Sequence, residues 1–404
     1  MLSLADARAK VIETVRRARR PIVSESIALG DAFGRVLARP IAADRDYPPF
    51  DRSTRDGFAV RASDVSQPGA ALEIAGESRA GTAFTGVIGP GQCVEIMTGA
   101  AVPPGMDAVI MIEHAQTENR GVRFHRGAER GQNIVPRGTE SHAGAELLAA
   151  GMRVGAAEMA VAGQVGCTRL EVARRPRLAI LSTGDEVVGV EAAPGPLEVR
   201  NSNGVSIEAL ARLASAEPVP LGNARDDASE LRRAIVRGLE SDVLVLSGGI
   251  SAGKYDLVEP VLRELGADFF FDSVAIRPGR PVVFGVCRGK FVFGLPGNPA
   301  STMVTFELFV RPAIELLQGA EAQELPIVAA KLAGPVRQKA PLTFFLPARL
   351  ESRAGEPVVR ELPWPSSGDI SALAHATGFL VVRPERLEMA AGEWAEYWPR
   401  RDAI

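Results

Sequence analysis

Four segments between residues 182 and 299 are rich in polar or turn-forming residues, three of them also contain glycine, and each follows an apolar run. They span residues 182–186 (STGDE), 223–227 (NARDD), 247–256 (SGGISAGKYD) and 294–299 (GLPGNP). Glycines allow a backbone to approach a ligand closely and to turn its amides toward an anion. Carboxylates supply the oxygen ligands that a hard cation such as Mg²⁺ prefers. This combination predicts a site for a phosphorylated ligand that is held together with a metal ion.

Charged side chains in and near these segments could bind such a ligand. Lys254, Arg277 and Arg280 could neutralise phosphate or another oxyanion, the arginines through a planar donor fork. A glycine pair or an acidic pair alone is usually structural, so the prediction depends on their convergence. Asp227 also fits a helix start, because Glu230 follows three positions later. The carboxylates that we consider are Asp185, Glu186, Asp226, Asp227 and Asp256.

The elements that carry these segments alternate between strands and helices. Apolar runs predict strands over 177–181, 217–221, 242–246 and 291–293. Periodicity and start signals predict helices over 203–214, from Asp227 to Leu239, through Leu265, and over 301–317. Repeated βα units predict a parallel sheet with helices on both faces. Since ligands bind beyond the carboxyl ends of parallel strands, all four segments should meet at one edge.

The rest of the chain divides by composition. Residues 1–21 have the apolar spacing of an amphipathic helix, and 156–165 also has a helical pattern. Short apolar runs between Gly and Pro clusters predict β structure over 44–140, and proline-punctuated runs predict a small barrel or sandwich after Gly319. We therefore expect a multidomain α/β protein whose regions are 1–43 with 141–175 (helical or linker), 44–140 (β-rich insert), 176–320 (three-layer α/β domain with a parallel-rich sheet) and 321–404 (C-terminal β domain).

Composition excludes several classes of protein. The 404 residues are 46% hydrophobic and 24% charged, as in ordinary globular proteins of several domains. A net charge of −3 argues against nucleic-acid binding. Three widely spaced cysteines argue against disulfide scaffolds and structural zinc and favour a reducing compartment. Without a signal-peptide pattern or an apolar run of membrane-spanning length, we expect a cytoplasmic protein that does not bind membranes.

Standard nucleotide-binding signatures are absent, and one hydrolase signature is present. The chain has neither a P-loop nor a GxGxxG motif. Residues 249–253 match the GxSxG nucleophile elbow, with Ser251 as the nucleophile. A hydrolase needs a later histidine base, and only His375, in the C-terminal β region, follows Ser251. We keep a serine hydrolase as a minor alternative.

Six ordered motifs resemble one family over nearly the whole chain. Segments 182–186 and 247–256 together resemble the molybdopterin-binding domain shared by the MoeA, MogA and gephyrin group. Residues 51–60 (DRSTRDGFAV) resemble the DxSxxDGxA signature of MoeA, and 97–109 resemble its MTGAxxPxGxDAV stretch. Matches continue in order through 131–144, 276–281 and 294–299. The chain therefore resembles the MoeA family, whose fold has the same four regions.

The resemblance implies a molybdopterin molybdenumtransferase. Such an enzyme cleaves adenylyl-molybdopterin with the help of Mg²⁺, releases AMP, and inserts molybdate to complete the molybdenum cofactor. It also implies an elongated homodimer whose composite active site lies between the α/β domain of one subunit and the β insert of the other. Partners implied by the family are a MogA-like adenylyltransferase and molybdoenzyme chaperones. A scaffold that has lost turnover is the second alternative, although retained acidic residues argue against it.

Residue by residue, the resemblance assigns roles. Asp56, Thr98, Glu186 and Asp256 match catalytic positions, and the last two are also the expected Mg²⁺ ligands. Arg277, Arg280 and Ser367 would hold molybdate. The expected substrate-binding residues are Gly184, Asp185, Ser247, Gly248, Gly249, Ser251, Gly253, Asp226, Pro296, Pro299 and Arg137.

The chain departs from the family pattern at several positions. Arg277 and Arg280 stand where many relatives carry lysine, and a guanidinium fork is not interchangeable with an ammonium group. Pro347 replaces an expected arginine, with Arg349 close by. Glu140 stands where Asp is common, and Arg52 and Arg55 replace Asn and Met. The sequence does not predict a preference for molybdate over tungstate.

Overall fold

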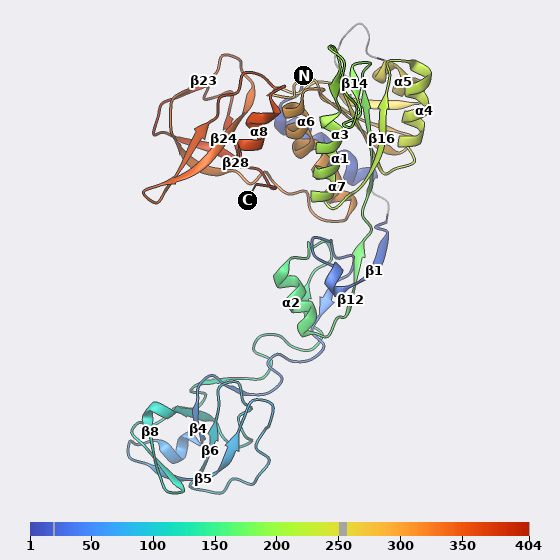
Figure 1. Ribbon diagram of the computed structural model, residues 1–404. Helices are drawn as coiled ribbons and strands as arrows, with labels where there is room; N and C mark the ends of the chain where they lie inside the picture. The colour runs from blue at the N-terminus through green and yellow to red at the C-terminus, as the bar shows by residue number, and fades with distance from the viewer. Residues whose placement is uncertain (19–20, 250–256, 404) are drawn as a thin grey trace.

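A computed structural model describes residues 1–18, 21–249 and 257–403. The molecule is elongated (Figure 1). The α/β domain and the C-terminal β domain lie side by side at one end, and the β insert lies at the other. A small module containing α2, β1 and β12 connects the two ends.

The α/β domain is built on a six-stranded sheet of order β16-β13-β17-β21-β20-β18. The first four strands are mutually parallel, and β20 runs antiparallel to both β21 and β18. The four strands predicted from apolar runs are confirmed, whereas β18 and β20 were not anticipated. Their bounds are β13 Arg177–Thr183, β16 Glu217–Ala224, β17 Val243–Ser247, β18 Ala267–Phe271, β20 Val283–Cys287 and β21 Lys290–Leu295.

Helices cover both faces of this sheet, as the repeated βα pattern predicted. Successive residues of β13 alternate between the two cores: Leu178 and Ile180 pack with α1, α3, α6 and α7, whereas Ala179 and Leu181 pack with α4 and α5. Asp227 caps α4 by accepting a hydrogen bond from the Glu230 amide at 2.8 Å. The helices are α1 Leu4–Ala18, α3 Ser202–Leu213, α4 Ala228–Gly238, α5 Val258–Glu264, α6 Pro299–Thr305 and α7 Arg311–Leu317.

The predicted helix over 301–317 contains a π-helical turn, Phe306–Val310, between α6 and α7. Pro312 has no amide hydrogen, so it cannot donate to the carbonyl of Leu308 four residues earlier. Arg8 of α1 fills this role, because its guanidinium donates to the Leu308 oxygen at 2.9 Å. The buried face of α1 thus completes the hydrogen bonding of the last helix of the domain.

The C-terminal β domain is a small closed barrel, as predicted. Its sheet has the order β19-β24-β25-β22-β28-β26, and an additional pairing of β24 with β26 closes it. Strand β19 belongs to the 276–281 segment, so the barrel and the α/β domain share a pairing. Phe345, Phe379 and Trp398 extend the α/β core into the barrel. The bounds are β19 Ile276–Arg277, β22 Val328–Leu332, β23 Val336–Arg337, β24 Thr343–Arg353, β25 Glu356–Glu361, α8 Ile370–His375, β26 Gly378–Val382, β27 Glu388–Met389 and β28 Trp394–Pro399.

The connecting module is formed by chain segments on both sides of the insert. Strand β1 (Ser24–Ala28) pairs with β12 (Arg169–Ala173), and β2 (Ile41–Ala42) pairs with β11 (Glu146–Leu148). Ala42 and Glu146 face each other in this second pair. A 3₁₀ turn (Leu29–Asp31) and α2 (Ala156–Gln164) complete the module. The apolar face of α1 packs in the α/β core, so this helix is not part of the module. Our four-region division of the chain remains a proposal.

The β insert contains a six-stranded sheet of order β7-β4-β6-β5-β9-β8 and a separate β3–β10 pair. Its strands are β3 Arg52–Ser53, β4 Gly57–Val60, β5 Ala71–Ser78, β6 Gln92–Ile96, β7 Ala108–Met111, β8 Ala115–Glu118, β9 Gly121–Phe124 and β10 Ile134–Val135, with 3₁₀ turns at Ala62–Val65 and Ile112–His114. In the described part of the chain, no helix is both long and apolar enough to cross a membrane.

Candidate active site

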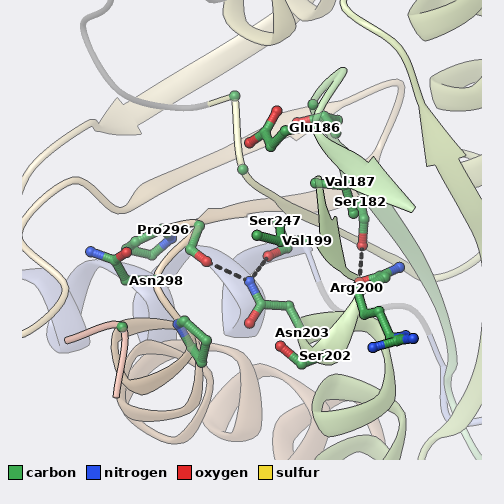
Figure 2. Close-up of a pocket in the computed structure, with 18 of the residues that line it drawn as sticks. Ser182, Glu186, Val187, Val199, Arg200, Ser202, Asn203, Ser247, Pro296 and Asn298 are labelled. Atoms are coloured by element: carbon green, nitrogen blue, oxygen red, sulfur yellow. Dashed lines mark hydrogen bonds between the residues drawn. The ribbon is translucent and has the colours of Figure 1, made fainter. Parts of the chain in front are cut away.

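A pocket of about 830 Å³ opens at the carboxyl edge of the parallel strands. The strand ends are in register there, because Ser182 pairs with both Asn223 and Ser247, and Ser247 pairs with Leu295. A flap of two short strands, β14 (Val187–Val188) and β15 (Val199–Arg200), and the first turn of α3 complete its walls (Figure 2). The predicted substrate-site residues that line it are Gly184, Glu186, Asp226, Ser247, Gly248, Gly249, Pro296 and Pro299.

Carboxylates gather at the β13 and β16 exits. Glu186 and Asp226 line the pocket, and the Asp226 amide donates to a carboxylate oxygen of Asp185 at 3.2 Å. Partial burial raises the pKa of Asp226, and the negative charges of Asp185 and Glu186 raise this pKa further. Such a site gains stability from a bound cation, because a cation relieves the repulsion between carboxylates.

The carboxylates of the pocket are too few to enclose Mg²⁺ by themselves, but they fit the way this ion binds together with a phosphorylated substrate. Within residues 1–18, 21–249 and 257–403, no three His, Cys, Asp or Glu side chains form a metal cage. Mg²⁺ commonly uses one or two carboxylates and completes its shell with water and substrate phosphates. Glu186 and Asp226 could supply that number. Asp256, Ser251 and Gly253 lie outside the described residues, so their predicted roles remain predictions.

The Gly248–Gly249 turn lies against the end of β13. Both glycines have positive φ, +90° and +61°. A Cβ on Gly248 would lie 2.6 Å from the Thr183 carbonyl oxygen, and one on Gly249 would lie 2.6 Å from Thr183 Oγ1. The amide of Gly248 donates to the Leu295 carbonyl at 3.2 Å, so it already has a partner in the protein. This turn needs glycine for conformation and for space.

Asparagines hold the pocket wall together, and sequence reasoning missed them. Asn201 accepts from the Ser182 hydroxyl at 2.9 Å, caps α3 through the Gly204 amide at 2.8 Å, and donates to Asn223. Asn203 donates to Ser247 Oγ and to the Gly297 carbonyl, both at 2.8 Å (Figure 2). Asparagine near a helix start is common as a cap, so nothing in the sequence distinguished these residues.

The C-terminal domain closes one side of the pocket. Gly368 and Ile370 line it, and the neighbouring Ser367 hydroxyl accepts a hydrogen bond from Asn298 Nδ2 at 2.8 Å. Ser367 thus lies beside the α/β segment 296–299. Arg349 donates to the His375 carbonyl at 3.1 Å and does not line the pocket.

The predicted oxyanion-binding arginines lie outside the pocket wall. Arg277 and Arg280 are exposed, and neither forms an ion pair within the described part of the chain. Arg280 precedes Pro281, which does line the pocket. The basic side chain in the described wall is Arg200, which sequence reasoning missed. Its Nε donates to the Ala192 carbonyl at 3.0 Å, which orients the guanidinium.

The remaining predicted residues lie on the β insert, in two groups. One carboxylate oxygen of Asp56 accepts hydrogen bonds from the Thr98 amide at 2.6 Å and from the Thr98 hydroxyl at 2.7 Å. These bonds lower the pKa of Asp56 and keep it ionised. Arg137 pairs with Asp46 at 2.8 Å. The β insert lies at the opposite end of the molecule from the α/β domain, whose residues line most of the pocket (Figure 1).

Two of the departures from the family pattern contact each other, because Arg52 pairs with Glu140 at 2.9 Å. This ion pair joins the start of the DxSxxDGxA segment to the segment that closes the insert. The structure gives no reason for Arg55, whose side chain is exposed.

Three family models match the chain in order. They describe the MoeA N-terminal region, domains I and II (residues 2–166), a probable molybdopterin binding domain (179–316), and the MoeA C-terminal region, domain IV (329–399). The molybdopterin molybdenumtransferase of Bacillus subtilis is 34% identical over 384 residues, which cover 92% of this chain and 89% of that protein. This chain belongs to the MoeA family.

Other MoeA relatives agree along the full length. The molybdopterin molybdenumtransferase of Haemophilus influenzae is 32% identical over 397 residues, 97% of each chain. The crystal structure of a molybdopterin biosynthesis MoeA protein from Pyrococcus horikoshii matches with a TM-score of 0.77 at 31% identity and covers 97% of this chain and 98% of that chain. The MoeA resemblance and the multidomain α/β fold with its C-terminal barrel are therefore confirmed.

Proposed function

We propose that this MoeA-family protein is a molybdopterin molybdenumtransferase that cleaves adenylyl-molybdopterin in an Mg²⁺-dependent reaction, inserts molybdate and releases AMP. The observation that carries the proposal is the pocket at the strand exits, where Glu186 and Asp226 lie opposite a wall contributed by the C-terminal domain. Full-length relatives named as such transferases support it.

The acidic edge of the pocket suits the phosphate end of the substrate. Glu186 and Asp226, with Asp256 from the resemblance, would hold Mg²⁺, which would neutralise charge on the phosphate oxygens. Burial raises the pKa of Asp226, and the negative charges of Asp185 and Glu186, which a cation would offset, raise this pKa further. Charge stabilisation of this kind, without a strong protein nucleophile, suits cleavage of a phosphoanhydride bond.

The side of the pocket near Ser367 suits molybdate. Molybdate is a dianion with only acceptor oxygens at neutral pH, so it needs donors such as hydroxyl and guanidinium groups. Ser367 lies beside the pocket wall, and Arg277 and Arg280 are free of ion pairs within the described residues. We propose that these three residues bind molybdate.

We also propose that the active site is completed by a second copy of the chain. Asp56, Thr98 and Arg137 belong to the insert, which lies at the other end of the molecule from the α/β domain that carries the pocket (Figure 1). A homodimer that brings the insert of one subunit to the pocket of the other would place these residues beside the carboxylates of the pocket. Asp56 is suited to such a role, because Thr98 keeps its carboxylate ionised.

The reaction also implies neighbours in the cell. An adenylylated substrate must be supplied by an adenylyl-transfer reaction, so we propose a MogA-like adenylyltransferase as a partner. Molybdoenzyme chaperones would receive the product. We propose the cytoplasm as the site of this exchange.

The test supplies adenylyl-molybdopterin, Mg²⁺ and molybdate and measures AMP release together with formation of active cofactor. We expect Glu186→Gln and Asp256→Asn to lower both by at least 10-fold. A double Ser251→Ala, His375→Ala variant should retain AMP release if the hydrolase alternative is wrong. No AMP release from the intact protein would instead favour the scaffold alternative and contradict our proposal.

A further inference from the structure

Ser367 is attached to the α/β domain through both its backbone and its side chain. The Ala300 amide donates to the Ser367 carbonyl at 3.2 Å, and Asn298 Nδ2 donates to Ser367 Oγ at 2.8 Å. Trp364, three residues earlier, packs against the cores of both domains. The C-terminal segment that carries Ser367 is therefore fixed against the segment 296–300.

The segment 296–300 is itself held firmly. Asn203 donates to the Gly297 carbonyl and to Ser247 Oγ, both at 2.8 Å, and Thr302 Oγ1 donates to the Pro296 carbonyl at 2.6 Å. Since a carbonyl oxygen can only accept, its contact with Asn203 must be made by an amide N–H. Pro296 and Pro299 further restrict the backbone on either side of Asn298. The backbone that carries Asn298 is thus held by the protein itself, and the hydrogen bond to Ser367 orients its side chain.

The direction of the Asn298–Ser367 hydrogen bond determines what the serine can offer. A serine hydroxyl has one hydrogen to donate and two lone pairs that accept. Because Ser367 Oγ accepts from Asn298, its own hydrogen remains available, and no acceptor for it exists among the described residues. Gly368, the next residue, lines the pocket.

We propose that Asn298 is a positioning residue that orients the Ser367 hydroxyl so that its hydrogen is donated to an oxygen of molybdate. This inference rests on the proposed function, because it assumes that molybdate is the oxyanion bound beside Ser367. An O–H donor directed at a dianion forms a charge-assisted hydrogen bond, which is stronger than a neutral one.

Asn298→Asp tests the direction of the bond. An aspartate has nearly the same shape as asparagine, but it can only accept, so it would take the hydrogen of Ser367 away from the ligand. We expect affinity for sodium molybdate, measured by calorimetry, to fall roughly 10- to 100-fold, the range for loss of a hydrogen bond to a charged group. In turnover, the KM for molybdate should rise while the KM for adenylyl-molybdopterin stays unchanged.

A double-mutant cycle separates positioning from simple charge repulsion. Asn298→Asp should cost more affinity in the wild-type background than in a Ser367→Ala background, where only repulsion remains. Asn298→Ala should weaken molybdate binding in the wild-type background and have no effect in the Ser367→Ala background. The control is Ser366→Ala, which removes the neighbouring hydroxyl; within the described part of the chain this hydroxyl accepts only from the Gly368 amide, at 3.3 Å. It should bind molybdate as the wild type does.

Equal effects of the Asn298 variants in both backgrounds would overturn the proposal, as would loss of molybdate binding in Ser366→Ala equal to that in Ser367→Ala. An unchanged affinity in Asn298→Asp would show that the hydrogen bond runs the other way. Thermal unfolding of each variant identifies any that fail to fold. If Asn298→Asp does not fold, the comparison of Asn298→Ala in the two backgrounds tests the proposal. Absence of AMP release from the wild type would contradict the proposed function, whereas molybdate titration tests Asn298 independently of turnover.

Discussion

At the scale of single residues, the negatively charged carboxylates at the ends of β13 and β16 repel one another when no cation is bound. The raised pKa of Asp226 means that the folded protein binds its proton more tightly than the unfolded chain does. Its contribution to folding is therefore neutral below the unfolded pKa of about 3.9. The contribution becomes unfavourable as the pH rises through the folded pKa and stays so at neutral pH.

Glu186→Gln should relieve part of this cost. We expect the pKa of Asp226, followed by NMR, to fall, and the free energy of unfolding at pH 7 without Mg²⁺ to rise by less than about 1 kcal/mol, since both groups are solvent-exposed. The gain should disappear below about pH 4. Stabilisation by added Mg²⁺ should be smaller than in the wild type. The control is Glu191→Gln, because the Glu191 carboxylate is exposed and does not line the pocket. An equal rise in the free energy of unfolding in this variant would contradict repulsion between Glu186 and Asp226 as the cause.

Some site residues could be predicted from the sequence, and others could not. Glu186, Asp226 and the Gly248–Gly249 turn were predictable, because carboxylates and glycines that follow buried strands must meet at one sheet edge. Asn203 and Arg200 were not, because their roles depend on which loop each side chain reaches. Asn203 contacts Gly297, 94 residues away in sequence, and no local pattern encodes that contact.

At the scale of elements, the Arg8 contact gives α1 a structural role beyond its apolar face. Arg8→Met would keep the aliphatic stem but leave the buried Leu308 carbonyl without its partner. We expect a loss of about 1–3 kcal/mol in the free energy of unfolding, measured with urea. Arg17→Met on the same helix is the control, because Arg17 is exposed and, among the described residues, pairs only with Glu13. It should change stability by less than about 0.5 kcal/mol. Equal losses in the two variants would contradict the role of the Leu308 carbonyl.

The glycine turn after β17 makes a second prediction at this scale. Gly248 and Gly266 have nearly the same φ, +90° and +89°, but only at Gly248 would a Cβ meet backbone, 2.6 Å from the Thr183 oxygen. Gly266→Ala should cost about 1–2 kcal/mol from backbone strain alone. Gly248→Ala should cost more and should also weaken substrate binding. Similar unfolding free energies for the two variants would show that the close approach to Thr183 is relieved by a small shift.

Elements differed in how well the sequence predicted them. Strands β13, β17 and β21 were predicted because each is an apolar run long enough to be buried on both faces. The edge pair of β18 and β20 escaped prediction, because its place in the sheet depends on antiparallel pairing with β21 and not on a βα repeat. The π-helical turn was not predicted either, and the carbonyl of Leu308 within it accepts a hydrogen bond from Arg8, 300 positions earlier in the chain.

At the scale of the whole molecule, the β insert that carries Asp56 and the α/β domain that carries the pocket lie at opposite ends (Figure 1). If a homodimer unites them, an Asp56→Asn subunit mixed with a Glu186→Gln subunit should regain activity. Each heterodimer would then hold one site with both residues intact and one with both changed. We expect up to about a quarter of wild-type activity after full subunit exchange, since half of the dimers would be mixed and each would have one intact site.

The control for complementation mixes Glu186→Gln with Asp226→Asn, two variants whose changed residues line the same pocket. No mixed dimer could then contain a complete site, so activity should stay at the level of the separate variants. Failure of the Asp56→Asn and Glu186→Gln mixture to recover activity, with exchange shown by mass spectrometry, would contradict a shared site. A shared active site could not have been predicted from the residues of a single chain, and only the family resemblance suggested a homodimer.

The pairing of Ala42 with Glu146 means that the chain leaves the connecting module and returns to it at the same place. Residues 43–145 are therefore an insertion whose two ends lie next to each other. A short linker could replace them without changing the direction of the strands on either side. The remaining polypeptide would keep the pocket and the barrel together with the full α/β core. In a protein organised in this way, the β insert can change in sequence or length while the fold that supports the pocket stays the same.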